Sequence, residues 1–194
     1  MKLNEKSKAI IEWIVAVILV VACCYYYVLN YKSFTPLQAF KNSERTMNYG
    51  PSEIIKELNK DNVKIYLAKY KNWFSAQAFE RNLITWKFAG GSVAGTPINF
   101  NEKITYTWSG AAVKDNKFLW NLYGYVNDIN ITKVSLQVKK GNTTESLEYQ
   151  LDKNNMFIFS WFDSNSGQST FTKIIGMDKD NKVVYEYKFP GGGE

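Results

Sequence analysis

A run of apolar residues near the N-terminus constrains this chain more than any other feature. It extends from Ala9 to Leu29 and contains one charged residue, Glu12. A helix rises about 1.5 Å per residue, so a segment of this length spans roughly 30 Å, the thickness of the hydrocarbon core of a bilayer. Glu12 falls in the first turn, where its carboxylate can reach the lipid headgroups. Residues 9–29 are therefore predicted to form a transmembrane helix.

The residues that flank this segment predict its orientation. Aromatic residues, which concentrate at membrane interfaces, occupy both ends: Trp13 at one, and Tyr25, Tyr26, Tyr27 and Tyr31 at the other. Three lysines precede the helix, namely Lys2, Lys6 and Lys8. Because positive charge collects on the cytoplasmic side, residues 1–8 are expected to be a cytoplasmic tail. The rest of the chain is then expected on the outer face of the cell membrane, held by a single pass.

Two other interpretations of the apolar segment lead to a different anchor. A cleaved secretory signal has a shorter apolar stretch and a small-residue exit, and the bulky run Tyr25–Tyr27 argues against it. The sequence Val20–Cys23 resembles a bacterial lipobox, in which Cys23 would be lipidated after cleavage. The length of the apolar segment favours the intact helix over lipidation at Cys23. Either anchor holds the domain at the outer face.

Composition argues against several classes of function. Formal net charge is +6, but the basic residues are scattered lysines, and arginine occurs only at Arg45 and Arg81. Nucleic-acid binding, which usually shows as an arginine-rich cluster or a basic stripe, is therefore not expected. Histidine is absent, and the two cysteines, Cys23 and Cys24, lie in the apolar segment. The domain is thus expected to hold together by its core alone, with no cofactor or metal.

The part after the anchor begins with signals for helix. Thr35 and Pro36 are a typical N-cap and first helical residue, followed by LQAFKNSERTM. After the break at Gly50-Pro51, Ser52 can cap a second short helix that continues through Leu58. Residues 33–60 are therefore predicted to be a helical segment that packs on one edge of the strands after it.

From Val63 onward the apolar period changes from helical to two, which predicts strands. Alternation over Val63–Ala68, Trp73–Phe79 and Ile84–Phe88 predicts an antiparallel meander within residues 61–110, which a glycine-rich loop and the strand Ile104–Trp108 complete. Six short strands follow, and they predict a β-sandwich over residues 117–189, with a sub-boundary near Ser109–Asn116 and a flexible tail at 190–194. These six are Phe118–Val126, Ile131–Val138, Glu145–Leu151, Met156–Phe162, Thr170–Gly176 and Lys182–Lys188. The fold class is mainly β (α+β).

Three segments of the C-terminal part resemble a bacterial immunoglobulin-like module. They are LYGYVND at Leu122–Asp128, the strand Thr132–Val138 and IIGMDKDNKVVYEY at Ile174–Tyr187. The whole soluble part, including the Pro36–Lys41 helix and the Trp86–Gly91 strand and loop, resembles uncharacterised membrane-anchored or lipoprotein families of Bacillus-like bacteria. The resemblance implies a location and a fold, and no established chemistry.

Candidate catalytic and ligand sites are few. The loop Gly90–Gly95 follows a strand but leads into no helix, so it does not predict a phosphate site. Asp178, Asp180 and Asn181 fit a hairpin turn better than a calcium loop, because a strand resumes directly after them. Asp128, Asp163 and Glu186 are the carboxylates from which a hydrolytic pair could be built, although nothing in the sequence brings two of them together.

The tryptophans allow two interpretations. Trp73, Trp86, Trp108, Trp120 and Trp161 could form a platform for the sugars of a wall polymer, but four of them occupy alternating apolar positions in strands, as core residues do. Trp73, which lies beside a turn, is expected to be the exposed ring.

The sequence therefore predicts a non-catalytic module outside the membrane that binds an envelope protein or a cell-wall polymer. Two alternatives are an envelope hydrolase that uses a carboxylate pair and a regulatory subunit that acts through a membrane partner.

Overall fold

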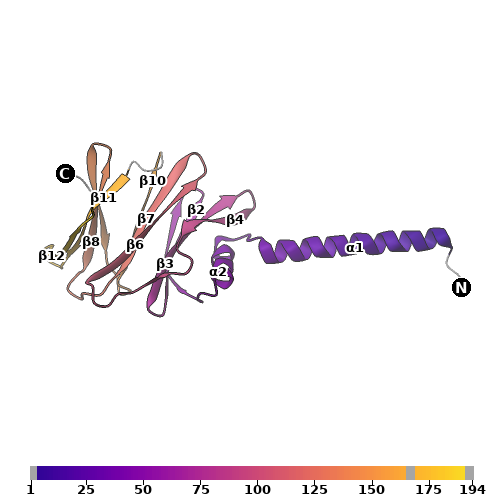
Figure 1. Cartoon of the computed structure of the whole chain (residues 1–194), viewed down its shortest axis with the longest axis horizontal. Coiled ribbons are helices and arrows are strands. Elements are labelled where there is room, and N and C mark those ends of the chain that lie inside the picture. Colours follow the sequence, from indigo (N-terminus) through magenta and orange to yellow (C-terminus); the bar gives the residue numbers. More distant parts are fainter. Residues whose placement is uncertain (1–3, 165–168, 191–194) are drawn as a thin grey trace.

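The computed structural model describes residues 4–164 and 169–190, and within them it has two helices and twelve strands. The predicted tails, 1–8 and 190–194, lie partly outside this range. Helix α1 (Glu5–Tyr31) projects from one side of a β domain (Figure 1). Its stretch Lys6–Tyr26 has a mean hydropathy of 2.3, is not buried by the rest of the protein, and is long enough to cross a membrane. The fold is mainly β with antiparallel sheets, as predicted.

Helix α2 (Pro36–Thr46) begins where the sequence predicted. The hydroxyl of Thr35 accepts a hydrogen bond from the backbone N–H of Gln38 at 3.1 Å, and Pro36 occupies the first helical position. Phe40 is buried against Tyr66 and Phe79 of the adjacent sheet, with ring centroids 5.2 and 6.4 Å away. This contact fixes the helix on one face of the domain.

The second predicted helix, Ser52–Leu58, is wrong. The segment is strand β1 (Glu53–Lys60), which pairs with β2 (Val63–Tyr70) in antiparallel register from Glu53↔Lys69 to Lys60↔Val63. The predicted helical segment 33–60 therefore contains helix only in its first part. The spacing of the apolar residues in EIIKELNK suits either element, and the backbone hydrogen bonds to β2 decide in favour of the strand.

The first sheet is a meander in the order β1-β2-β3-β4, where β3 is Trp73–Asn82 and β4 is Thr85–Gly91. A two-residue strand, β5 (Thr96–Pro97), pairs with the start of β3. One face of this sheet packs on α2. The other face packs on a second sheet, and the buried contacts between the two sheets include Ile65, Leu67, Phe74, Leu119, Tyr123 and Ile158.

The second and third sheets complete the stack of layers. The second, with the order β10-β7-β6, contains β6 (Ile104–Val113), β7 (Lys117–Val126) and β10 (Met156–Asp163). The third has the order β12-β11-β8-β9, and its strands are β8 (Lys133–Lys140), β9 (Thr143–Gln150), β11 (Ser169–Met177) and β12 (Val183–Lys188). The second sheet is central, since it is covered on both faces: Leu119 packs toward the first sheet and Leu122 toward the third.

The predicted sub-boundary at Ser109–Asn116 lies inside a continuous β-hairpin. β6 and β7 pair without interruption from Ile104↔Val126 to Val113↔Lys117. The small residues of this segment have packing roles. Gly110 lies beneath the ring of Phe118, which a Cβ at that position would approach to 2.4 Å, and Ala111 lies against Gly90 of β4. The C-terminal group of strands therefore begins at Ile104 rather than at residue 117.

Candidate functional site

Aromatic side chains collect on the face of the central sheet that looks toward the third sheet. Side chains alternate along a strand, so Tyr106 and Trp108 of β6 share this face. In the neighbouring β7, Leu122 pairs with Trp108 and Trp120 pairs with Gly110, so Trp120 projects from the same face as Trp108. Phe118, two residues before Trp120, shares this face. A glycine at position 110 leaves room for the two rings to lie across β6.

These rings join others from the third sheet in one continuous row, which we call the aromatic stripe. Its successive ring centroids are 4.8 to 6.0 Å apart, in tilted or edge-to-face arrangements. Such geometries stabilise aromatic pairs beyond the area that they bury. The stripe consists of Tyr106, Trp108, Phe118, Trp120, Phe171, Tyr187 and Phe189.

Trp108 is the most exposed ring of the stripe, with 56% of its surface accessible. The prediction that Trp108 belongs to the core is therefore wrong. Its strand position faces the third sheet, but the edge strand of that sheet, β12, ends nearby. The pairing of β12 with β11 extends only from Met177↔Val183 to Lys173↔Lys188, whereas β11 itself continues to Phe171 and beyond. The ring of Trp108 contacts Phe171, with centroids 6.0 Å apart, beyond the end of β12. Tyr187 is also exposed, while the other rings are half-buried.

The other tryptophans lie elsewhere or deeper. Trp161 of β10 is buried, and Trp86 and Trp120 are half-buried, in agreement with their alternating strand positions. Trp73 is exposed at the start of β3, in the first sheet, and it makes no part of the stripe. The structure thus places Trp73 and Trp108 on different sheets.

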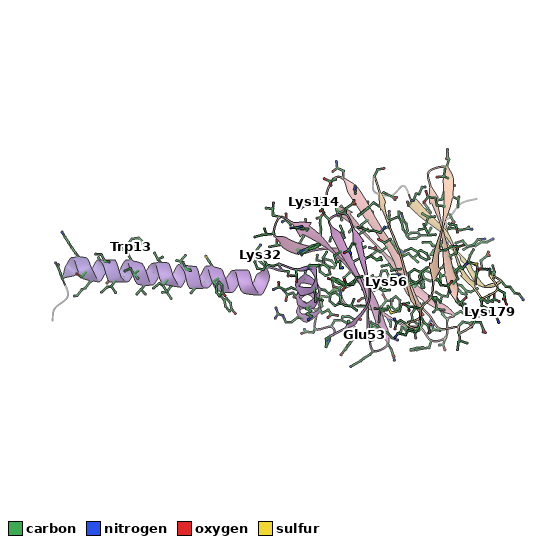
Figure 2. The ribbon with its side chains drawn as sticks, turned by 180° about the vertical axis from the view of Figure 1, so that it is seen from behind. Trp13, Lys32, Glu53, Lys56, Lys114 and Lys179 are labelled. Carbon is green, nitrogen blue, oxygen red and sulfur yellow. The ribbon has the colours of Figure 1, made fainter. Side chains whose placement is uncertain are left out.

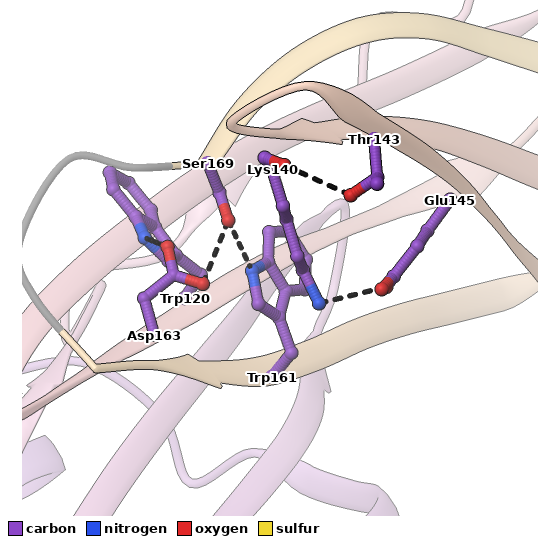
Figure 3. A network of polar contacts seen from close by, with 7 residues as sticks. All are labelled: Trp120, Lys140, Thr143, Glu145, Trp161, Asp163 and Ser169. Atoms are coloured by element: carbon purple, nitrogen blue, oxygen red, sulfur yellow. Dashed lines mark hydrogen bonds and ion pairs between the residues drawn. The ribbon is translucent and has the colours of Figure 1, made fainter.

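A buried carboxylate holds the inner side of the stripe in place (Figure 3). Asp163, at the end of β10, is only 7% exposed. Its Oδ2 accepts a hydrogen bond from the indole Nε1–H of Trp120 at 2.9 Å, and its Oδ1 accepts one from the hydroxyl of Ser169 at 2.8 Å. The hydroxyl of Ser169 in turn accepts from the Nε1–H of Trp161 at 3.2 Å. One carboxylate therefore orients two indoles from neighbouring strands.

This network is stabilised by hydrogen bonds rather than by an opposite charge. In the described part of the chain, no lysine or arginine lies within ion-pair distance of Asp163. Hydrogen bonds to an ionised acceptor are stronger than neutral ones, and each oxygen of Asp163 has a donor. The nearby pair Lys140–Glu145, at 2.8 Å, closes the β8–β9 hairpin and is a separate contact (Figure 3).

Burial makes the phenol of Tyr106 still harder to ionise than that of a free tyrosine. The pKa of Tyr106 is raised well above its ordinary value, first by desolvation and then by the neighbouring Tyr187. Tyr106 is therefore a neutral phenol at any physiological pH. The surface of the stripe consists of apolar ring faces. Its only polar side-chain atoms are the phenol hydroxyls of its tyrosines and the indole N–H groups of its tryptophans.

Two of the three candidate carboxylates, Asp163 and Asp128, lie far apart, and the third, Glu186, has a lysine partner of its own. Asp163 is registered with Phe118 at one end of β7, whereas Asp128 follows the other end of this ten-residue strand, which is about 30 Å long. Asp128 pairs with Lys103 at 3.2 Å, and a backbone hydrogen bond from Asn130 is the main cause of its lowered pKa. Glu186 pairs with Lys173 at 3.1 Å on the exposed strand β12.

Other sequence candidates have structural partners of their own. Oδ1 of Asp178 accepts from the backbone N–H groups of Asp180 and Lys182, at 2.9 Å each, which is the hairpin turn that the sequence predicted. Gly90 and Gly91 lie in β4, and the glycine-rich loop leads to β5 rather than to a helix. Cys23 is exposed within α1, which continues past it without a break.

A hollow lies beside α2, away from the stripe. It measures about 660 Å³ and is bordered by Glu44, Arg45 and Tyr49, among others. Glu44 is buried, and its carboxylate accepts from the backbone N–H of Ser52 at 3.2 Å. That carboxylate joins the end of α2 to the start of the first sheet, so it has a structural role in the fold.

Comparison with known proteins leaves the stripe as the main evidence on function. No family model, curated protein or solved structure matches the chain. Sequence reasoning weighed Trp108 and Trp120 as platform rings but favoured the core for both, and it missed Tyr106, Phe118 and Phe171. The alternation of side chains places Tyr106 and Trp108 on one face of β6, and Phe118 and Trp120 on one face of β7. The register of β6 with β7 shows that these two faces coincide, and this register is what the sequence does not give.

Proposed function

We propose that this protein is a membrane-anchored, non-catalytic binding module of the cell envelope, and that its aromatic stripe binds a cell-wall polymer. In this proposal α1 crosses the cell membrane once, and the β domain lies on the outer face. The apolar window Lys6–Tyr26 supports the membrane span, and the lysines at its N-terminal side support a cytoplasmic N-terminus.

We further propose that strands β6–β12 form an immunoglobulin-like sandwich. Taken in chain order, the first, second and fifth of these seven strands form one sheet, and the third, fourth, sixth and seventh form the other. This division matches the fibronectin-like variant of the sandwich, and it differs from the constant-type immunoglobulin domain in the sheet that holds the fourth strand. The inter-sheet disulfide of antibody domains has no counterpart, because the two cysteines both lie in α1. The loops and edges of such sandwiches commonly carry binding sites.

The exposure of Trp108 is the observation that carries the binding proposal. A large apolar ring at the surface is costly to leave in water, and here it stands beside a row of rings on well-paired strands. Asp163 fixes the indole of Trp120, against which Trp108 packs at 5.6 Å between centroids. A platform that is already rigid loses little conformational entropy when a ligand stacks on it.

The narrow exposed surface of the aromatic stripe favours a linear polymer over a protein as its ligand. Only Trp108 and Tyr187 are strongly exposed within the stripe, and the remaining rings contribute partial faces. A stable protein–protein contact buries about 800 Å² on each partner, which is far more than a single row of half-covered rings offers. A polysaccharide chain needs only a row of flat apolar faces for its sugar rings, with polar groups at the sides.

The arrangement of carboxylates supports binding rather than hydrolysis. A glycosidase pair requires two carboxyl groups within about 10 Å across the scissile bond. Asp163 and Asp128 lie at opposite ends of β7, and both oxygens of Asp163 accept hydrogen bonds that orient other side chains.

Co-sedimentation with purified wall sacculi tests the proposal. The full-length protein, held in lipid nanodiscs, is mixed with sacculi and centrifuged, and empty nanodiscs serve as the control. We expect the protein to pellet with the sacculi and to be released by soluble wall fragments. Absence of binding, together with a stoichiometric protein that co-purifies from gently solubilised membranes, would overturn the polymer and favour a protein partner.

A further inference from the structure

The turn between β3 and β4 exposes two large apolar side chains at a single point of the domain. Leu83 is 84% exposed and Ile84 is 74% exposed, between the end of β3 at Asn82 and the start of β4 at Thr85. We call these two residues the apolar tip. Adjacent apolar side chains that project into solvent at a hairpin end mark a contact surface, since their transfer from water is favourable.

The backbone conformation at the apolar tip is one that does not favour a leucine. Leu83 has a φ of 56°, a left-handed conformation that asparagine and glycine adopt at lower steric cost. Among the described residues, the seven other non-glycine residues with positive φ are all Asn, Asp or Lys. The turn itself therefore does not call for a leucine at this position.

Local hydrogen bonds hold the apolar tip in a fixed shape. The Nε–H of Arg81 donates to the carbonyl oxygen of Leu83 at 3.2 Å, and the hydroxyl of Thr85 donates to the carbonyl oxygen of Asn82 at 3.1 Å. Both side chains of the tip consequently project from a defined base rather than from a loose loop.

The apolar tip lies beside the point where the chain leaves α1. The backbone N–H of Trp86 donates to the carbonyl oxygen of Ser33 at 2.7 Å, and Ser33 is two residues beyond the end of α1 at Tyr31. Leu83 is three residues from Trp86, which is at most about 10 Å of extended chain. Figure 1 accordingly shows β4 on the side of the domain that faces α1.

Positive side chains surround the base of the apolar tip. Arg81 and Lys87 flank it in the sequence and are exposed, although Lys87 also pairs with the buried Glu80 at 3.2 Å. The Nζ of Lys114, from the β6–β7 turn, donates to the carbonyl oxygen of Arg81 at 2.7 Å. Lys32 directly follows α1, and Figure 2 shows Lys32 and Lys114 on the helix-facing side. The carboxylates of Glu80 and Asp115 lie among these four cations, so the base of the apolar tip carries an excess of positive charge. An apolar point with such an excess of cations matches an anionic lipid surface.

We propose that the apolar tip inserts into the outer leaflet of the same membrane that α1 crosses. This inference rests on the proposed membrane anchorage, and it adds a second point of attachment that fixes the orientation of the domain. Lys179 lies at the end of the domain farthest from α1 (Figure 2), so that end projects away from the lipid. The domain is then held upright rather than swinging freely on the short segment after Tyr31.

Depth-dependent quenching tests the proposal on the full chain. In a Cys23→Ala, Cys24→Ala background, a single cysteine replaces Ile84, carries a bimane label, and is reconstituted in vesicles of phosphatidylglycerol and phosphatidylethanolamine that contain a brominated-acyl lipid. Ile129 provides the matched control, because it is 91% exposed and borders the same hollow as Lys179. Leu83→Cys is the second labelled position, and near-UV circular dichroism checks that each variant is folded.

We expect the brominated lipid to quench the label at residue 84 or 83 at least threefold more than the label at residue 129. Equal, weak quenching at all three positions would overturn the insertion of the apolar tip. Carbonate extraction of the vesicles separates this result from the anchorage: if α1 spans the bilayer the protein resists extraction whatever the quenching shows. A protein that is released by carbonate would overturn both the anchorage and the tip.

Discussion

The indole of Trp120 donates to the carboxylate of Asp163 at 2.9 Å, and this bond ties the middle strand of the central sheet to the end of its neighbour β10. Through Ser169 the same carboxylate also orients Trp161, so one acidic residue sets the positions of rings on two strands. The surface on which Trp108 packs is therefore defined by a buried charge.

Replacement of that charge tests its role. Asp163→Asn should lower the free energy of unfolding by about 1–3 kcal/mol, because an amide is a weaker acceptor and its NH₂ group opposes a donor. Urea unfolding of the full chain in detergent micelles, followed by near-UV circular dichroism, measures the effect. Asp180→Asn, in an exposed turn, is the control and should change the midpoint little. Equal midpoints for the two variants would mean that the network contributes nothing to stability.

Truncation of two tryptophans should separate the core from the surface. Trp161→Ala should cost about 3–5 kcal/mol, since the ring is buried between the sheets. Trp108→Ala should cost about 1 kcal/mol, which corresponds to the loss of its contacts with Trp120 and Phe171. Chemical denaturation of both variants gives the comparison. A loss at Trp108 as large as that at Trp161 would show that the Trp108 ring is covered in solution.

Alkaline pH should destabilise the domain through its buried tyrosines. Burial is the main cause that raises the pKa of Tyr66 and of Tyr123 to about 12 each, from an ordinary value near 10. The neutral phenol is thus favoured in the folded state, so its contribution is complete below about pH 10 and is lost as the pH rises toward 12. Tyr66→Phe should lose less stability than the wild type between pH 9 and 11.5 in parallel urea titrations. An unchanged slope would contradict the burial of that hydroxyl.

Gly110 should resist even the smallest substitution. A Cβ at this position would lie 2.4 Å from the ring of Phe118 and 3.0 Å from that of Trp120, so Gly110→Ala must displace both rings. We expect a loss of about 1–3 kcal/mol and an altered near-UV spectrum. Gly141→Asn is the control, because a Cβ there meets nothing within 4 Å and asparagine tolerates its φ of 58°. A spectrum identical to the wild type for Gly110→Ala would show that the rings do not lie across β6.

The alternation of apolar residues predicted most of the strands, because side chains that face a core repeat every two residues. β2 and all strands from β7 to β12 were predicted within a few residues of their observed bounds. β1 was missed since Ile54, Ile55 and Leu58 also fit one face of a helix, and only its pairing with β2 selects the strand. Local patterns do not contain such tertiary choices.

The candidate site depended on relationships between strands that sequence periodicity does not reveal. The alternation grouped Trp108 with Ile104 and Tyr106 on one face of its strand, but it does not tell how much of that face the third sheet covers. The convergence of Trp120, Asp163 and Ser169 joins three strands from two sheets. Nothing in the spacing of these residues along the chain predicts their contact.

A comparison of two exposed tryptophans tests the central claim most directly. Trp108 lies in the aromatic stripe, whereas Trp73 lies on the first sheet, and both are accessible to solvent. The affinity of the full-length protein in nanodiscs for wall sacculi is measured by co-sedimentation for the wild type, Trp108→Ala and Trp73→Ala. Loss of one stacked ring should weaken binding at least tenfold in Trp108→Ala and leave Trp73→Ala within twofold of the wild type. Wild-type affinity in Trp108→Ala, or an equal loss in both variants, would contradict the assignment of the stripe as the binding surface.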